Sequence, residues 1–180
     1  ARMAQQGTPA GFLKSRIREV PDFPKPGINF YDITTLLRDP EGFKASIEGL
    51  SAPFAGAGIE IVVGIESRGF ILGGAVADRL GAGFCPIRKP GKLPAKTLRE
   101  SFSLEYGTDA IEIHTDAIQA GQRVLVVDDV LATGGTAKAA AALVKRLGGT
   151  LHGLAFLIEL DFLNGREQLA GEQVLSVLHY

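Results

Sequence analysis

The chain has 180 residues, of which 46% are hydrophobic and 22% charged, and its net charge is −1. This composition is typical of a folded globular protein, and a single domain of this length buries roughly 70% of the surface that its unfolded chain exposes. The near-zero net charge excludes a protein that binds nucleic acid mainly through a basic surface. We therefore expect no nucleic-acid partner, although a local cationic pocket remains compatible with the composition.

The single cysteine, Cys85, excludes an internal disulfide and fits a reducing compartment. The first residues, "ARMAQQGTPA", lack the apolar core of a signal peptide. The longest apolar run, "IEIVVGI", is far too short to span a membrane. We therefore expect a cytoplasmic protein with no membrane partner.

The N-terminal part is expected to contain two helices separated by extended chain. Leu13, Ile17 and Val20 recur at helical spacing, which predicts an amphipathic helix, whereas the prolines of "PDFPKPGINFYDITTLL" predict extended chain. A second helix is expected to begin at Pro40, after Asp39 as N-cap. Its buried face is expected to contain four apolar residues: Phe43, Ile47, Leu50 and Phe54.

Strands and helices alternate through the rest of the chain. The expected elements are strand "IEIVVGI", a helix ending near Gly81, strand "FCPIRK", strand 123–128, helix 136–147, strand "GLAFLIEL" and strand "VLSVLH". This alternation predicts an α/β fold with a mainly parallel sheet. In such sheets ligands bind beyond the carboxyl ends of the strands.

A β-hairpin interrupts this alternation. Residues 101–106 alternate between apolar and polar side chains, and "AIEIH" alternates again. Gly107 to Asp109 supply residues typical of the turn between the two strands.

Two acidic residues, Asp128 and Asp129, are expected to emerge at the carboxyl end of the buried strand "RVLVV". The loop "LATGGT" follows, and Gly134 and Gly135 allow close backbone approach. Because a helix begins at about Thr136, free backbone N–H groups and the positive end of the helix dipole point at this loop. The sequence therefore predicts a phosphate-binding loop.

Two common phosphate motifs do not fit. A P-loop requires Gly-Lys-Ser/Thr at the helix start, and a dinucleotide fingerprint requires Gly-x-Gly-x-x-Gly. Carboxylates repel phosphate, so Asp128 and Asp129 are expected to face hydroxyl groups or a hydrated magnesium ion. A ligand with a diol at one end and a phosphate at the other is ribose 5-phosphate; the alternative is an acidic strand end followed by an ordinary glycine turn.

The stretch "VLVVDDVLATGGT" resembles the phosphoribosyl-pyrophosphate (PRPP) motif of type I phosphoribosyltransferases. The resemblance implies that Asp128 and Asp129 hold the ribose hydroxyls. It also implies a 5′-phosphate loop made of Ala132, Thr133, Gly134, Gly135 and Thr136. The implied fold is a mainly parallel sheet flanked by helices, with a small N-terminal hood and a mobile β-hairpin. We expect one domain over residues 1–180, with the hood at about 9–35, the core at about 36–180 and the hairpin at 92–114.

The family's pyrophosphate loop corresponds to "GIESRGF", where Arg68 offers paired donors to pyrophosphate. The resemblance also implies a cis peptide between Glu66 and Ser67. Arg88 and Lys92, in "IRKPGKLP", are expected to help neutralise pyrophosphate. Without the resemblance these cations would be read as a solvated, mobile loop.

Three stretches, "PDFPKPGINFYDI", "ESRGF" and "SLEYG", resemble the members of the family that act on adenine. The resemblance implies a base pocket formed by Asn29, Phe30, Val130 and Leu160. Asn29 stands where an aliphatic side chain is common, which leaves its effect on base selection open. Glu105 corresponds to the carboxylate that handles the proton near the purine N7.

The implied reaction is adenine plus PRPP giving AMP plus pyrophosphate, with Mg²⁺ held mainly by PRPP and water rather than by protein ligands. The resemblance also implies a homodimer. His114, His152 and His179 are dispersed, with no partner at metal-ligand spacing. Two alternatives are a phosphoribosyltransferase for a 6-oxopurine and a catalytically inactive regulator that binds PRPP and DNA; the second predicts an added DNA-binding segment or a basic surface.

Overall fold

The structure is a computed structural model that describes residues 8–104 and 106–180. The chain divides into two compact units, Ala1–Gly49 and Leu50–Tyr180. The predicted boundaries of the hood and the core stay a prediction. No helix among the described residues is both long and apolar enough to cross a membrane.

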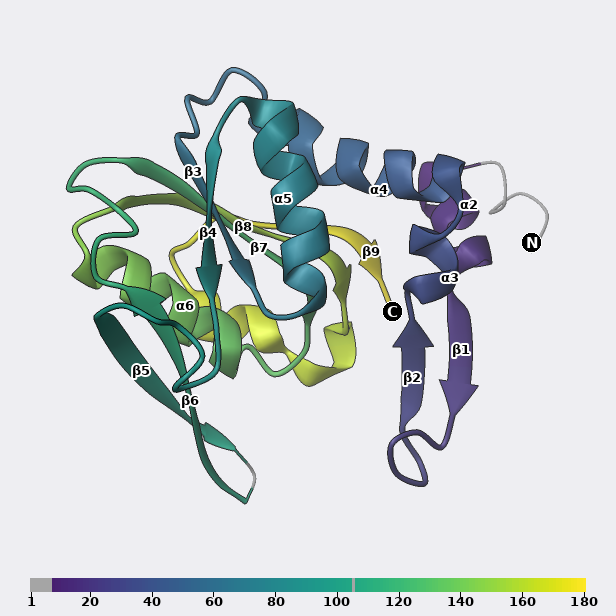
Figure 1. Cartoon of the computed structure of the whole chain (residues 1–180). Helices are drawn as coiled ribbons and strands as arrows, with labels where there is room; N and C mark the ends of the chain where they lie inside the picture. Colours follow the sequence, from purple (N-terminus) through teal and green to yellow (C-terminus); the bar gives the residue numbers. More distant parts are fainter. Residues whose placement is uncertain (1–7, 105) are drawn as a thin grey trace. The chain divides into compact units, whose positions relative to one another are not determined.

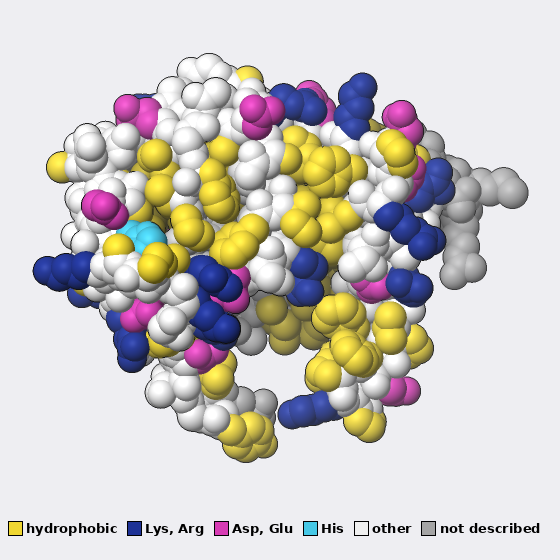
Figure 2. All heavy atoms as spheres, in the orientation of Figure 1, with side chains coloured by type: hydrophobic (Ala, Val, Ile, Leu, Met, Phe, Trp, Pro, Cys, Tyr) yellow, Lys and Arg dark blue, Asp and Glu magenta, His cyan; other side chains and the backbone are white. Residues whose placement is uncertain are grey.

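The first unit contains a two-stranded antiparallel ribbon and short helices (Figure 1). Its elements are α2 (Pro9–Arg16), β1 (Arg18–Pro21), β2 (Asn29–Asp32), α3 (Thr34–Leu37) and α4 (Pro40–Ser51), the last of which runs two residues into the second unit. Figure 2 shows hydrophobic side chains gathered at the tip of the β1–β2 ribbon, where Phe23 is 50% and Ile28 45% exposed.

Two expectations for this unit are wrong in part. The first helix ends at Arg16, because Ile17 is already extended and Val20 pairs with Phe30 of β2. A β-branched residue fits a paired strand better than a helix, so pairing overrides the helical spacing. The segment expected to be wholly extended also contains the short helix α3. The start of α4 at Pro40 is confirmed, with Ile47 and Leu50 buried.

Asp32 fixes the start of α3. Its Oδ1 accepts hydrogen bonds from the Thr34 hydroxyl at 2.7 Å and the Thr34 backbone N–H at 2.9 Å, and its Oδ2 accepts two from Arg18. The Thr34 hydrogen bonds are the main reason that the pKa of Asp32 is lowered to about 2. A lowered pKa in the folded state stabilises the fold above the unfolded-state pKa, and this stabilisation is lost as the pH falls towards 2.

We expect Asp32→Asn to lower the free energy of unfolding near neutral pH by about 1–2 kcal/mol, because the amide loses the ionic partner and half of the accepting capacity. Urea unfolding followed by circular dichroism, at neutral pH and at a pH near the lowered pKa, measures this. The difference from wild type should shrink in acid. Asp78→Asn, on an exposed carboxylate of α5 (Arg68–Leu80), is the matched control. Equal loss at both pH values would contradict the assignment.

The second unit is built on a five-stranded, wholly parallel sheet in the order β4-β3-β7-β8-β9. The predicted parallel sheet is therefore confirmed. Its strands are β3 (Ile61–Ile65), β4 (Gly83–Ile87), β7 (Arg123–Leu131), β8 (Thr150–Glu159) and β9 (Val174–His179). The central strands are apolar almost throughout because both faces of the sheet are covered.

The direction in which the chain crosses the sheet reverses between β3 and β7: from β3 it moves to β4 at one edge, and from β7 it moves through β8 to β9 at the other edge. Helix α5 connects β3 to β4 on one side, and α6 (Gly135–Arg146) connects β7 to β8 on the other. Because such crossovers are right-handed, the two helices cover opposite faces of the sheet. The core under α6 includes Val63, Val126 and Phe156. The reversal leaves a crevice beyond the carboxyl ends of β3 and β7, which is where ligands bind in open α/β sheets.

The predicted hairpin is confirmed, but its turn is not. Strands β5 (Thr97–Leu104) and β6 (Gly107–His114) pair antiparallel, and Gly107 is already paired with Leu104. Gly107 to Asp109 therefore belong to strand β6 and do not form the turn. An isolated bridge between Arg88 and Glu112 joins the hairpin base to the chain after β4. Figure 2 shows hydrophobic side chains at the hairpin tip, where Tyr106 is 85% exposed.

Candidate active site

The acidic pair lies at the reversal of the sheet. Strand β7 continues to Leu131 and pairs with β8 up to Glu159. Asp128 and Asp129 therefore lie inside the strand, whereas the sequence had predicted them at its carboxyl end. The pairing of β7 with β3 ends at Val127. The two carboxylates therefore belong to the part of β7 that extends past its β3 partner into the crevice.

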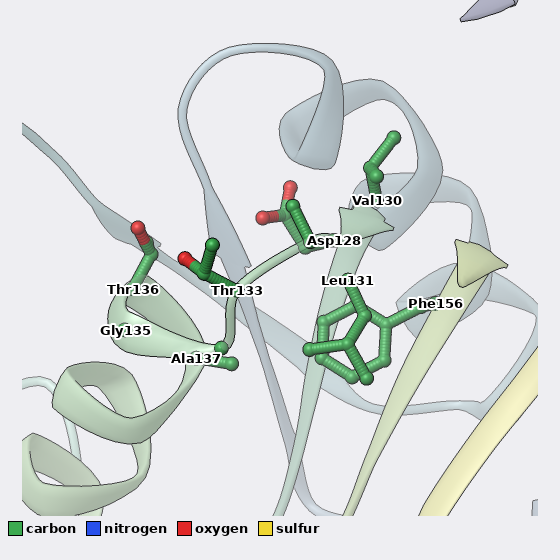
Figure 3. A pocket seen from close by; sticks show the side chains of 10 residues that line it. Asp128, Val130, Leu131, Thr133, Gly135, Thr136, Ala137 and Phe156 are labelled. Carbon is green, nitrogen blue, oxygen red and sulfur yellow. The ribbon is translucent and has the colours of Figure 1, made fainter. Parts of the chain in front are cut away.

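The loop after β7 forms a pocket of about 90 Å³ (Figure 3). Figure 3 shows the side chains of Asp128, Thr133 and Thr136 on the same side of the loop, with Leu131 and Phe156 packed beneath. The lining consists of Asp128, Val130, Leu131, Ala132, Thr133, Gly134, Gly135, Thr136, Ala137 and Phe156. The structure thus brings all five predicted loop residues and the first acid together.

The loop presents backbone donors. Helix α6 begins at Gly135 after Gly134, whose φ is 91°, and no side chain caps it. This left-handed conformation favours glycine. An uncapped helix start leaves its first N–H groups without intrahelical partners, and together with the helix dipole they attract an anion. The geometry therefore supports the predicted phosphate-binding loop, with hydroxyls of Thr133 and Thr136 at its rim.

The two acids differ in their surroundings. The Asp128 side chain lines the pocket, whereas the Asp129 carboxylate accepts a hydrogen bond from Arg68 Nε at 2.5 Å and Asp129 is only 8% exposed. Burial, and then the neighbouring charge of Asp129, raise the pKa of Asp128 well above its usual value. A bound hydroxyl or cation beside Asp128 would therefore favour its ionised form.

The loop after β3 contacts the acidic pair through Arg68. The Glu66–Ser67 peptide is cis, as expected, and Arg68 is the first residue of α5. Through the Arg68–Asp129 ion pair, the predicted pyrophosphate loop and the predicted ribose-binding strand are in contact.

The segment after β4 carries the other predicted cations. Glu66 Oε1 accepts a hydrogen bond from the Lys89 backbone N–H at 2.7 Å and lies 3.3 Å from Arg88 Nε. That Nε atom is buried and has no hydrogen-bond partner among the described residues. A guanidinium has five N–H donors, so Arg88 can bind an anion through donors that do not face Glu66. Lys92 is exposed, in the turn that follows.

Glu112 is a site-supporting residue that the sequence analysis missed. It is 6% exposed, and it accepts hydrogen bonds from the Gly91 N–H at 2.9 Å, the Thr97 hydroxyl at 3.3 Å and Arg99 Nε at 3.1 Å. The Gly91 hydrogen bond is the main reason that the pKa of Glu112 is lowered. Glu112 thereby ties the segment carrying Lys92 to the hairpin base. Its alternating position in "AIEIH" predicted a strand, but nothing local marked it as buried.

The predicted base contacts are not brought together in one described pocket. Val130 lines the loop pocket, whereas Leu160 lies outside that lining, and its N–H donates to the Leu131 carbonyl at 3.0 Å. Asn29 and Phe30 belong to β2 in the other unit, where the Phe30 and Phe23 rings meet edge to face at 5.3 Å. Glu105 lies outside the described residues. These four base contacts and Glu105 stay predictions.

His179 has acidic neighbours that its sequence position did not indicate. Its Nδ1 lies 2.7 Å from Asp161 Oδ1, and ligand atoms of Glu159, Asp161 and His179 lie within 4.8 Å of one another. The Glu159 carboxylate is already paired with Arg166 at 2.7 Å and accepts from Ser176 at 2.6 Å. Protein partners therefore already bind the Glu159 carboxylate, and the cluster links the C-terminal strand to the segment after β8.

The comparisons with known proteins agree on one family. The phosphoribosyl transferase domain family matches residues 36–169. The adenine phosphoribosyltransferase of Koribacter versatilis (strain Ellin345) is 62% identical over 168 residues, which cover 93% of this chain and 92% of that protein. The chain belongs to the adenine phosphoribosyltransferase family.

Solved structures of adenine phosphoribosyltransferases share the fold. The enzyme from Rhodothermus marinus has a TM-score of 0.91 and 58% identity, with 96% of this chain and 98% of that chain covered. The enzyme from Saccharomyces cerevisiae, solved with adenine and an imino-altritol bisphosphate, has a TM-score of 0.90 and 41% identity, with coverages of 94% and 98%. The predicted type I phosphoribosyltransferase fold is therefore confirmed.

Proposed function

We infer that this protein transfers the phosphoribosyl group of PRPP to adenine and so forms AMP and pyrophosphate. The observation that carries the inference is the pocket that Asp128 shares with an uncapped helix start, together with the ion pair between Arg68 and the next residue of the strand, Asp129. Such a pocket suits a ligand that combines hydroxyls, one phosphate and a second anionic group. Membership of the adenine phosphoribosyltransferase family supports adenine as the acceptor.

The proposed sugar and phosphate roles follow from this pocket. Asp128 and Asp129 accept hydrogen bonds from the ribose hydroxyls, and the 5′-phosphate binds the N–H groups of the loop and of α6. Loss of pyrophosphate leaves positive charge on the sugar, so the transition state resembles an oxocarbenium ion. Fixed positive groups stabilise the leaving pyrophosphate most effectively where water is excluded. Arg68, Arg88 and Lys92 take that role.

The residues proposed to contact adenine are Asn29, Phe30, Val130 and Leu160, and Glu105 is proposed to exchange a proton with the purine near N7. A positioned general acid or base typically contributes about 10²–10⁴ in rate. Glu105 directly follows the last residue of β5 in the sequence, and closure of the predicted mobile hairpin would bring its carboxylate to the base and exclude water.

The residues of the pocket fit a magnesium ion held mainly by PRPP and water. Carboxylate and hydroxyl oxygens are the ligands that Mg²⁺ prefers, and Asp128 with the threonine hydroxyls supplies fewer than its octahedral shell requires. The ion, when bound, neutralises charge on the departing pyrophosphate. Asp128 and Asp129 would hold it through the ribose hydroxyls and water.

We further propose a homodimer in the cytoplasm. The single cysteine supports the reducing compartment, and the family resemblance supports the dimer. Sedimentation of the purified protein tests the dimer directly.

A panel of bases tests the reaction. With PRPP and Mg²⁺, adenine is expected to release pyrophosphate at least about a hundred times faster than hypoxanthine, guanine or xanthine, because a site that hydrogen-bonds a 6-amino group leaves its own polar groups unpaired when a 6-oxo group binds. Preference for a 6-oxopurine would support the first alternative and contradict the proposal. PRPP binding without turnover of any base would support the inactive regulator.

A further inference from the structure

The segment Asp161–Leu169, here called the buttress, packs its backbone directly on the phosphate loop. It comprises the short helices η2 (Asp161–Leu163) and η3 (Gly165–Leu169). A Cβ atom built on Gly165 would lie 2.3 Å from the Ala132 carbonyl oxygen and 3.2 Å from the Gly134 nitrogen. Likewise, a Cβ atom built on Gly134 would lie 2.4 Å from the Gly165 carbonyl oxygen. The two backbones therefore touch directly, and the Gln168 side chain of the buttress packs beside Gly134.

The buttress is anchored at both ends. At its start, Glu159 pairs in register with Leu131, the residue before the phosphate loop, and is 6% exposed. Arg166 donates to both Glu159 oxygens, at 2.7 and 3.3 Å, and its Nη1 donates to the Val174 carbonyl at 3.0 Å. At its other end, Leu169 is 3% exposed in the core under α6. A fork-shaped guanidinium fixes this geometry more tightly than an ammonium group would.

The charge state of Glu159 is consistent with such an anchor. Burial alone would raise the pKa of Glu159, but the hydrogen bonds from Arg166 and Ser176 outweigh burial and lower it. The carboxylate therefore stays ionised and available to Arg166.

The phosphate loop depends on backbone position more than most anion sites do. It contains no lysine or arginine, so its affinity rests on N–H groups whose directions are set by the backbone of residues 132–136. We propose that Gly165 and Arg166 are positioning residues for the 5′-phosphate: they hold the loop in the conformation in which its N–H groups converge on one anion. This role rests on the proposed function for the identity of the ligand, and neither residue touches a reacting atom.

Gly165→Ala tests the contact. The added methyl group must displace the Ala132 carbonyl by about 1 Å to reach an ordinary contact distance, and a misplacement of that size at a site can cost about a hundredfold. Calorimetric titration of the full chain with ribose 5-phosphate, and separately with magnesium pyrophosphate, gives the two dissociation constants. We expect Gly165→Ala to raise the Kd of ribose 5-phosphate at least tenfold and to leave that of pyrophosphate within twofold.

Gly74→Ala is the matched control, since a Cβ at this position of α5 meets no atom within 4 Å. It should leave both constants unchanged. Arg166→Lys keeps the charge without the fork and should weaken ribose 5-phosphate alone, by a smaller factor. This variant decides the question if Gly165→Ala does not fold.

Two results would overturn the proposal while leaving the proposed function intact. One is a wild type and a Gly165→Ala variant that bind ribose 5-phosphate equally. The other is a variant in which both ligands weaken by the same factor, as expected of a general loss of folded protein. A wild type that binds pyrophosphate but not ribose 5-phosphate would overturn the proposed function together with the positioning role.

Discussion

Neutralising both acids of β7, with Asp128→Asn and Asp129→Asn, is expected to raise the Kd of PRPP by about a hundredfold or more, because a hydrogen bond to a charged group contributes about 1.5–3 kcal/mol. The amide can still accept a hydrogen bond, but it loses the charge that strengthens the bond to each ribose hydroxyl. Titration calorimetry with PRPP and Mg²⁺ measures the change. Since the phosphate loop is untouched and two repelling charges are removed, inorganic phosphate should bind at least as tightly as to wild type.

The single variants should differ in stability. The raised pKa of Asp128 means that its ionised form destabilises the fold at neutral pH, and this cost grows as the pH rises from the unfolded-state pKa to the folded-state pKa. Asp128→Asn removes that cost, so its Tm near neutral pH should equal or exceed the Tm of wild type. Asp129→Asn removes the negative charge that pairs with Arg68, and its Tm should be lower.

A control with the same charge change separates local binding from net charge. Asp78→Asn with Asp116→Asn neutralises two exposed acids of the same unit and should leave PRPP affinity unchanged. If the Asp128 and Asp129 variant bound PRPP as tightly as this control, neither carboxylate could be holding the ribose.

The sequence predicted those parts of the fold that depend on local pattern. The apolar run of β3 identified a strand buried on both faces, and the alternation over residues 101–106 identified the hairpin. The loop at Gly134 was predictable because its glycines and the helix start lie in one continuous stretch. Where helical spacing and strand pairing disagreed, as at Val20, pairing with β2 determined the structure.

The parts that could not be predicted depend on contacts between distant residues. Nothing near Gly165 indicates that its carbonyl lies against Gly134, because that contact joins segments on two different strand connections. Glu112 alternates like any strand residue, and only the structure shows that Gly91 and Arg99 converge on it. The Arg68–Asp129 ion pair could likewise not be predicted, although each residue belongs to a motif that the sequence analysis describes.

Removing the carboxylate of Glu105 is expected to lower kcat with adenine by about 10²–10⁴, the usual contribution of a general acid or base. Both Glu105→Ala and Glu105→Gln should show this loss, because an amide can hydrogen-bond to the purine but cannot exchange a proton with it. The KM for PRPP should change by less than about threefold, since Glu105 is proposed to act on the base and not to bind the ribose or phosphates. Steady-state pyrophosphate release measures both constants.

Thr108→Ala is the matched control, since Thr108 is exposed and pairs with Ser103 on the same hairpin. Its kcat should remain that of wild type, which would show that the hairpin tolerates a truncated side chain. Recovery of most of the activity in Glu105→Gln but not in Glu105→Ala would mean that the residue acts through hydrogen bonding alone. Normal kcat in both variants would show that the proton is handled elsewhere, and the proton-transfer role of Glu105 would then be wrong.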